Sequence, residues 1–301
     1  MEKIISQIFR KIEKDPLDLQ LYNDCFDGIK ILYKTDKEKC FEFNRQLRQK
    51  CSAAKKQSRD WSFIEGIEEI RKESYHLEAK DVFDSYLIYL EWNRPANKKF
   101  YLPRRRVLKT LVQDLQDLAD HKIKFLGISL PPRVGKSTLC IMFMTWIIGK
   151  LPDVANVMSG HSDKLTDGFY REILSIITDP VTYLWQEVFP GVKLVNTSAK
   201  NETIDLEREK RFPTMTCRSI GGTLTGAVEI GEGGVLYRLN SATLPTVVVG
   251  LGGAISRWQK LPETSSTQPW LCPTVAVYSN LTRTHSTPLT SRLRIVCRAI
   301  L

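Results

Sequence analysis

The sequence predicts an α/β fold in which a helical amino-terminal region precedes a mainly parallel sheet that is covered by helices and incomplete at its carboxy-terminal side. Residues 1–90 place apolar side chains at a spacing of three to four, the period of amphipathic helices. Between residues 122 and 178, short apolar runs alternate with helical periods, which is typical of a parallel sheet covered on both faces. The 301 residues, 42% hydrophobic and 26% charged, match a soluble globular chain of about two domains.

The helical region is expected to span residues 1–93. Three apolar stripes predict its helices and its core, and no residue in it suggests catalysis. The stripes are Ile4, Ile5, Ile8, Phe9 and Ile12; Trp61, Phe63, Ile64, Ile67 and Ile70; and Val82, Tyr86, Leu87, Tyr89 and Leu90.

Residues 94–121 are expected to form a basic linker and a lead-in helix. The segment 94–106 concentrates six basic residues around Phe100 and Tyr101, and two prolines interrupt it. We therefore expect a loop here, followed by a helix over residues 107–119. A basic segment with aromatic residues can hold phosphates or stack a base, or it can be a solvated connector, and the sequence leaves both interpretations open.

An α/β domain is expected over residues 122–237. Each predicted strand is a short apolar run, and each predicted helix carries an apolar face. The predicted strands are 123–130, 155–160, 215–220 and 234–237, and the predicted helices are 135–148 and 164–178. The polar stretch 196–211 predicts a hairpin or an exposed loop.

The composition changes after Tyr237. Residues 238–301 hold sixteen Ser or Thr and a single acid, Glu263, and no period extends beyond a few positions. The valine-rich fragments 246–250 and 274–279 favour an all-β appendage as one interpretation. The lack of carboxylates is unusual for a domain, and it favours a non-native or disordered tail, produced by a shifted reading frame or a truncated gene.

A net charge of +10 and a pI of about 9.2 favour a polyanionic partner. Residues 238–301 contain seven Lys or Arg and one acid, so most of the excess positive charge lies in this segment. No apolar run approaches the roughly 20 residues needed to cross a bilayer, and the charged amino terminus lacks a signal-peptide hydrophobic region. We expect a cytoplasmic protein with no membrane partner.

The cysteines and histidines predict no metal cage. The seven cysteines form no CxxC pair, and the four histidines are scattered. We expect the cysteines to be reduced and mostly buried.

The strongest motif is LPPRVGKST, Leu130–Thr138, at the junction of an apolar strand and an apolar-faced helix. A strand-to-helix turn that ends in Gly-Lys-Ser/Thr points successive backbone N–H groups inward, where they cradle phosphates. The first glycine of the usual pattern is replaced by Leu130. We expect this loop to bind ATP with Mg²⁺ through Pro132, Arg133, Val134, Gly135, Lys136, Ser137 and Thr138.

Each group of the loop has an expected role. Gly135 lets the backbone approach the phosphates, and Lys136 neutralises the β- and γ-phosphates. Ser137 coordinates Mg²⁺, and Thr138 adds a hydroxyl near the helix start. Arg133 is placed to reach the γ-phosphate, so Lys136 and Arg133 are the candidate catalytic residues.

Four segments of the chain resemble, in the same order, the large terminase subunit of tailed bacteriophages and prophages. They are PPRVGKS with the helix after it, LPDVANVMSGHSDKLTDGFYREI, FPGV and RSIGGTLTGA, within residues 83–237. The resemblance implies an ATPase that translocates duplex DNA during viral packaging, followed by a ribonuclease-H-like nuclease. It also implies ATP and Mg²⁺ as cofactors and, as partners, double-stranded DNA, a portal protein, a small terminase subunit and further copies in a ring.

The chain departs from this family at the second nucleotide motif. There an apolar strand should end in acids that orient Mg²⁺ and activate water, but GGVLY is followed by Arg238, Leu239 and Asn240. Glu229 and Glu232 lie upstream as substitutes. The carboxylate cluster of a two-metal nuclease is also missing. We therefore expect impaired hydrolysis and no nuclease activity.

Three hypotheses remain open. The chain is the ATP-driven motor portion of a terminase large subunit, or an inactive nucleotide- or DNA-binding remnant of a prophage terminase. These two hypotheses differ in the residues after Tyr237, where the catalytic acids of the family are expected. The third is an unrelated phosphate-loop NTPase, such as a helicase or a small-molecule kinase, although the later motifs of a helicase and the arginine-rich lid of a kinase are not found.

Overall fold

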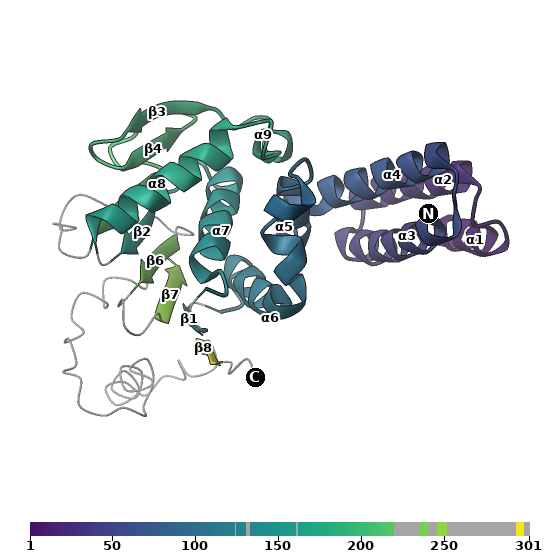
Figure 1. The fold of residues 1–301 in the computed structure, drawn as a ribbon, viewed down its shortest axis with the longest axis horizontal. Coiled ribbons are helices and arrows are strands. Elements are labelled where there is room, and N and C mark those ends of the chain that lie inside the picture. The colour runs from purple at the N-terminus through teal and green to yellow at the C-terminus, as the bar shows by residue number, and fades with distance from the viewer. Residues whose placement is uncertain are drawn as a thin grey trace. The chain divides into compact units, whose positions relative to one another are not determined.

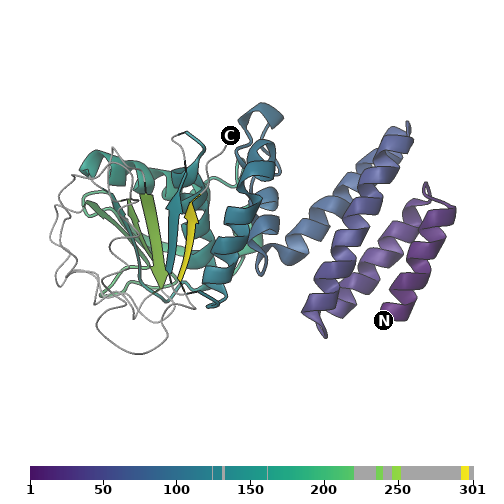
Figure 2. The same ribbon diagram turned by 90° about the horizontal axis from the view of Figure 1, so that it is seen from below.

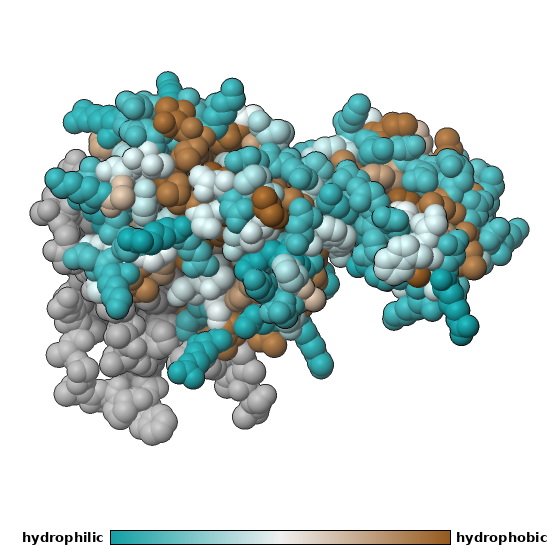
Figure 3. All heavy atoms as spheres, turned by 45° about the horizontal axis from the view of Figure 1, so that its top comes forward, coloured by the Kyte–Doolittle hydropathy of each residue, from teal (hydrophilic) through white to brown (hydrophobic). Residues whose placement is uncertain are grey.

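The chain divides into two units, Met1–Trp92 and Asn93–Leu301, and each is described by itself. The structure is a computed structural model. It describes residues 1–123, 125–130, 133–160, 162–219, 235–239, 246–251 and 293–297. Hydrophilic residues dominate the visible face of each unit, and hydrophobic residues form small areas among them (Figure 3).

The first unit, described throughout, is built of helices, as the sequence predicts (Figure 1). They are α1 (Glu2–Lys14), α2 (Leu19–Tyr33), α3 (Lys37–Gln57), α4 (Trp61–Ala79) and α5 (Phe83–Leu90). Before α2, α3 and α4 stand Asp18, Asp36 and Asp60, and each carboxylate accepts a hydrogen bond from a first-turn backbone amide. Such caps contribute about 1 kcal/mol each.

The predicted apolar stripes form the core of this unit with two exceptions. Buried members of the first two stripes are Ile5, Phe9, Ile12, Phe63, Ile67 and Ile70. Ile4 and Trp61, also predicted there, are 52% and 77% exposed. Each residue turns the helix by about 100°, so Ile4 lies about 100° from Ile5, and Trp61 lies about 200° from Phe63. The prediction that Ile4 and Trp61 belong to the core is wrong, because it rested on their apolar character alone.

A polar network lies inside the first unit, between α3, α4 and α5. The Glu78 carboxylate is 2% exposed and pairs with the Arg48 guanidinium at 3.1 Å. It also accepts hydrogen bonds from Asn44 Nδ2 at 2.8 Å and Ser85 Oγ at 2.7 Å. Arg48 lies over the Tyr75 ring at 4.5 Å. The buried charge is therefore both paired and hydrogen-bonded.

The second unit begins with a helix that is longer than predicted. α6 runs Tyr101–Ala119, whereas we expected a loop up to residue 106 and a helix from Val107. Pro103 is compatible with the helix because it lies in the first turn, where backbone N–H groups have no helical acceptor. The remaining helices of this unit are the 3-10 turn η1 (Ala96–Lys98), α7 (Lys136–Lys150), α8 (Asp163–Thr178) and the short α9 (Trp185–Val188).

The second unit also holds the sheet, and the predicted hairpin in residues 196–211 is present. Its strands are β1 (Phe125–Ser129), β2 (Asn156–Gly160), β3 (Leu194–Ser198), β4 (Thr203–Leu206), β5 (Met215–Ser219), β6 (Val235–Leu239), β7 (Thr246–Leu251) and β8 (Leu293–Cys297). Their order across the sheet is β3-β4-β5-β2-β6-β7-β1-β8. The chain is therefore α/β, with a mixed sheet.

The expectation of a mainly parallel sheet is wrong. β2 pairs in parallel with β5 and β6, and β1 with β8. The pairs β3–β4, β4–β5, β6–β7 and β7–β1 are antiparallel. Only six residues join β6 to β7, and a parallel pair needs a crossover of about a dozen or more. An apolar run such as residues 246–250 predicts a strand but does not indicate whether that strand pairs in parallel or antiparallel.

The described helices of this unit lie on one side of its sheet (Figures 1 and 2). A Cβ built on Gly160 in β2 would stand 3.1 Å from the Leu165 side chain and 3.2 Å from that of Thr166. This close approach shows which face of β2 is covered by α8. The prediction of helices on both faces is not met within the residues that the structure describes.

The strands β7 and β8, with the end of β6, fall within residues 238–301. The valine-rich fragment 246–250 is thus a strand. The fragment 274–279, the acids Glu229, Glu232 and Glu263, and the rest of this segment lie outside the described residues.

Five cysteines lie buried in the described part of the chain, as predicted. Cys25, Cys40, Cys51, Cys140 and Cys217 are buried and free, and burial raises the pKa of each thiol. Within the described part of the chain, no three His, Cys, Asp or Glu side chains are placed to hold a metal ion. No described helix has the length and apolar character to span a membrane.

Candidate functional site

The predicted phosphate loop connects β1 to α7. Gly135 caps α7 with φ of 99° and ψ of 26°, and Arg133 has φ of 65°, so both lie in the left-handed region. Leu130, which replaces the usual first glycine, is 8% exposed. Pro131 and Pro132 lie outside the described residues. Left-handed residues before a helix turn successive backbone N–H groups toward one point, which is the geometry of an anion-binding nest.

Lys136 is buried inside this loop. Only 6% of the Lys136 surface is exposed. Its Nζ donates a hydrogen bond of 2.5 Å to the Leu130 carbonyl oxygen. Burial lowers the pKa of Lys136, since the charged amine has lost water. An anion placed at the loop would favour the charged amine again.

The start of α7 follows a glycine N-cap. The residue at the N-cap, Gly135, has no side chain, so it offers no acceptor to the first-turn N–H groups. Such N–H groups at a helix start favour an anion. Ser137 and Thr138 stand in this turn and are half-buried, and Val134 precedes Gly135 with similar exposure. Arg133 is exposed. Of the loop residues that the sequence predicts to bind ATP, residues 133–138 lie within the described part of the chain and Pro132 lies outside it.

Phe100, from the basic segment 94–106, lies beside this loop, and Arg104, in the first turn of α6, lies over the Phe100 ring. A Cβ on Gly135 would lie 2.4 Å from Cε2 of Phe100, so the Phe100 ring packs directly against the loop. Arg104 lies over the same ring at 5.1 Å and donates to the Phe100 carbonyl oxygen at 3.1 Å. The clustering of basic and aromatic residues was the signal that pointed to this segment.

Gly135→Ala is expected to lower the free energy of unfolding by about 1–3 kcal/mol, because an L-residue at positive φ is strained and the new methyl meets Phe100. Gly168→Ala in α8 is the control, since a Cβ there meets nothing within 4 Å and alanine favours a helix. Chemical denaturation of both variants measures the difference. Equal stability of the two would contradict the described loop conformation.

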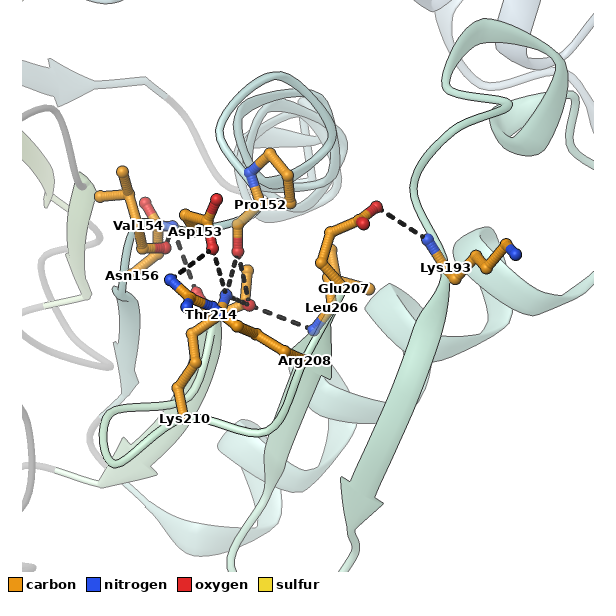
Figure 4. A network of polar contacts seen from close by, with 10 residues as sticks. All are labelled: Pro152, Asp153, Val154, Asn156, Lys193, Leu206, Glu207, Arg208, Lys210 and Thr214. Atoms are coloured by element: carbon orange, nitrogen blue, oxygen red, sulfur yellow. Dashed lines mark hydrogen bonds and ion pairs between the residues drawn. The ribbon is translucent and has the colours of Figure 1, made fainter.

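The other end of α7 is anchored by a polar network, shown in Figure 4. The Thr214 hydroxyl donates to the Pro152 carbonyl oxygen at 2.8 Å and accepts from Leu206 N at 3.1 Å and from Lys210 Nζ at 2.7 Å. Lys210 also donates to the Pro152 carbonyl, and burial lowers the pKa of Lys210. The Trp185 indole N–H donates to the carbonyl of Thr145, within α7, at 2.9 Å. The helix that begins at the loop is therefore held at its far end.

Thr214→Val is expected to reduce the free energy of unfolding by about 1–3 kcal/mol, since the buried Leu206 N–H loses its acceptor without a change in side-chain shape. Thermal denaturation measures this loss. Thr110→Val, on the exposed face of α6, should change stability far less. A similar effect of both substitutions would mean that the network contributes nothing.

The register of the sheet locates the predicted second nucleotide motif. Leu239 in β6 is opposite Val247 in β7, which is opposite Ile128 in β1. β6 and β1 therefore run in the same direction, two strand spacings or about 10 Å apart. The end of β6 reaches the level of the phosphate loop, and Arg238 and Leu239 occupy the positions where acids were expected.

Two acids near this edge were not foreseen from the sequence. Asp163, the first residue of α8, accepts a hydrogen bond from the Ser219 hydroxyl at the end of β5. Burial raises the pKa of Glu202, which lies near Asp163 and Asp167. β2 and β5, whose ends these acids flank, are three and four strand spacings from β1, about 14–19 Å. They are therefore not direct substitutes for the missing acids.

The loop thus combines a strand, a left-handed turn and a helix start with a glycine N-cap around a buried amine. Comparisons with models of known protein families, with curated proteins and with solved structures find no match for this chain. The loop brings together backbone N–H groups and an ammonium group, and such groups favour an anion.

Proposed function

We propose that this chain is the ATP-binding motor portion of a phage-type DNA-packaging terminase large subunit. The observation that carries the proposal is Lys136, a buried amine at the start of α7, next to the left-handed N-cap Gly135. Burying an amine is unfavourable unless a ligand or a partner compensates it. The order of the motifs LPPRVGKST and GGTLTGA supports the terminase family within the phosphate-loop class.

The residues present fit a nucleoside triphosphate. The first-turn N–H groups of α7 and the Lys136 ammonium would hold the β- and γ-phosphates. The missing side chain of Gly135 leaves room for the Phe100 ring, which packs against the loop. Ser137 would hold Mg²⁺, which neutralises phosphate charge when bound. Arg133, exposed on the loop, is free to approach the γ-phosphate, and Phe100 with Arg104 forms one wall of the site.

Hydrolysis is the weaker part of the function, and a nucleotide-binding remnant is the second candidate. It is favoured by Arg238 and Leu239 at the end of β6, where an acid would orient Mg²⁺ and another would activate water. Duplex DNA is the proposed partner. It would be bound through its phosphates by Lys and Arg, with affinity that falls steeply with salt. A portal protein and a small terminase subunit are the other proposed partners.

The experiment is ATP binding and steady-state ATP hydrolysis by the full chain with Mg²⁺, with and without duplex DNA. Binding with turnover that DNA stimulates supports the motor. Binding without turnover supports the remnant. Absence of ATP binding would reject both, and preference for a small-molecule phosphoacceptor over DNA would favour a kinase.

A further inference from the structure

A pocket lies in the first unit, where the turn between α1 and α2 meets the turn between α3 and α4. Gly66 of α4 lets the two turns approach, because a Cβ there would stand 2.6 Å from Cδ2 of Leu19. The volume of the pocket is about 290 Å³. Sites for whole small molecules occupy roughly 300–1,000 Å³, so this pocket suits a single side chain. We call it the turn pocket, and its lining residues are Leu17, Leu19, Ser58, Asp60, Ser62 and Phe63.

The lining of the turn pocket is apolar on one side and polar on the other. The polar side holds two hydroxyls and one charged group, the Asp60 carboxylate. Its Oδ1 accepts a hydrogen bond from Ser62 N at 3.0 Å, and Asp60 N donates to Ser58 Oγ at 3.1 Å. These bonds fix the turn, and Asp60 Oδ2 has no hydrogen-bond partner among the described residues. The pocket therefore offers an anionic acceptor beside an apolar wall.

We infer that the turn pocket binds an arginine or lysine side chain of a partner protein. Such a side chain buries its methylene stem on apolar surface and keeps its charged head on polar groups. The stem would lie along Leu17 and Leu19, and the head would donate to Asp60 Oδ2. Cation and carboxylate then form a charge-assisted hydrogen bond. A nucleic acid does not fit, because its phosphates carry the same sign of charge as Asp60.

The surroundings of the turn pocket favour a protein over a free amine. Leu17 is 48% exposed, and Trp61, between Asp60 and Ser62 in the sequence, is 77% exposed. A small amine would leave this apolar surface in water, whereas a protein segment would cover it. Trp is also enriched at protein interfaces. The expected partner segment therefore carries its basic residue next to large apolar residues. No residue of the phosphate loop takes part, so the inference does not depend on nucleotide binding.

The test is selection of a displayed library of random peptides on the full chain, with counter-selection on Asp60→Asn. Asparagine is also a good helix N-cap, so this variant should keep α4 while it loses the charge. The enriched peptides should carry Arg or Lys beside large apolar residues. Fluorescence anisotropy of synthesised, labelled peptides then measures affinity. Asp60→Asn should weaken binding by about tenfold or more, and Leu17→Ser by about threefold or more.

Two matched variants are the controls. Asp36→Asn makes the same change at the N-cap of α3, and Ile31→Ser removes an apolar side chain of α2 that is 51% exposed. Neither residue lines the turn pocket, so both variants should bind peptide within about twofold of wild type. Circular dichroism verifies that all variants remain helical.

Changing the peptide tests the pairing itself. Replacement of its basic residue by glutamine should weaken binding to wild type by about tenfold and weaken binding to Asp60→Asn little further, since the two changes remove the same contact. Independent, additive losses would place the basic residue away from Asp60 and overturn the inference.

Three other results would also overturn it. Enrichment of no peptide that distinguishes wild type from Asp60→Asn excludes the site. Arginine amide that binds as tightly as the peptides would assign the turn pocket to a free amine. Loss of duplex DNA binding in Asp60→Asn or Leu17→Ser would assign it to nucleic acid.

Discussion

Lys136→Met is expected to weaken ATP binding by about 10- to 100-fold. The ammonium group is the only cation of the described loop that is held inside it, and a hydrogen bond to a charged group is worth about 1.5–3 kcal/mol. Methionine keeps the apolar stem of the side chain in the same space, so the helix start should retain its shape. A fluorescent ATP analogue with Mg²⁺ measures the change in affinity.

The matched control is Lys150→Met at the opposite end of α7. Lys150 lies over the Trp146 ring at 4.2 Å, remote in sequence from the loop. Its replacement should leave the ATP affinity within about twofold of wild type, as is usual for substitutions away from a site. Equal effects of both substitutions would show that binding follows net charge rather than the loop.

The same Lys136→Met variant should not be destabilised in the absence of nucleotide. Burial already lowers the pKa of Lys136, and its Nζ donates a hydrogen bond to the Leu130 carbonyl oxygen. Removing a desolvated amine should leave the free energy of unfolding unchanged or raise it. Lost ATP binding without lost stability indicates a residue kept for function. Marked destabilisation would instead indicate a structural lysine.

Local patterns allowed most elements of the fold to be predicted. The apolar run 123–130 and the periodic runs 135–148 and 164–178 match β1, α7 and α8, because apolar spacing reflects local geometry. The direction of β7, and the face of the sheet on which the described helices lie, depend on connections and on packing between distant segments. The start of α6 was misplaced because a proline in a first turn is compatible with a helix.

The part of the candidate site that lies in one short segment of the sequence could be predicted. Gly135, Lys136 and Ser137 act through consecutive backbone groups, so the motif alone located them. Phe100 is 35 residues earlier in the chain, and only the fold places its ring against Gly135. Asp163 was missed for the same reason, since its contact with Ser219 joins a helix start to a strand end.

Glu78→Ala is expected to lower the free energy of unfolding of the first unit by about 3–5 kcal/mol. The substitution removes one partner of a buried ion pair and leaves the Arg48 guanidinium, whose side chain is 13% exposed, without its carboxylate. Asn44 and Ser85 lose acceptors at the same time. An unpaired buried charge is far more unfavourable than a missing surface pair.

Hydrogen exchange in the full chain measures this effect where it arises, because the two units need not unfold together. Protection of the α3 and α4 amides should fall in Glu78→Ala, with a smaller fall in Glu78→Gln, which keeps the shape and part of the hydrogen bonding. Glu42→Ala, on the exposed face of α3, is the control and should change stability by less than about 0.5 kcal/mol. Unchanged protection in Glu78→Ala would mean that water or rearrangement satisfies Arg48, and the network would then not be what joins α3 to α4.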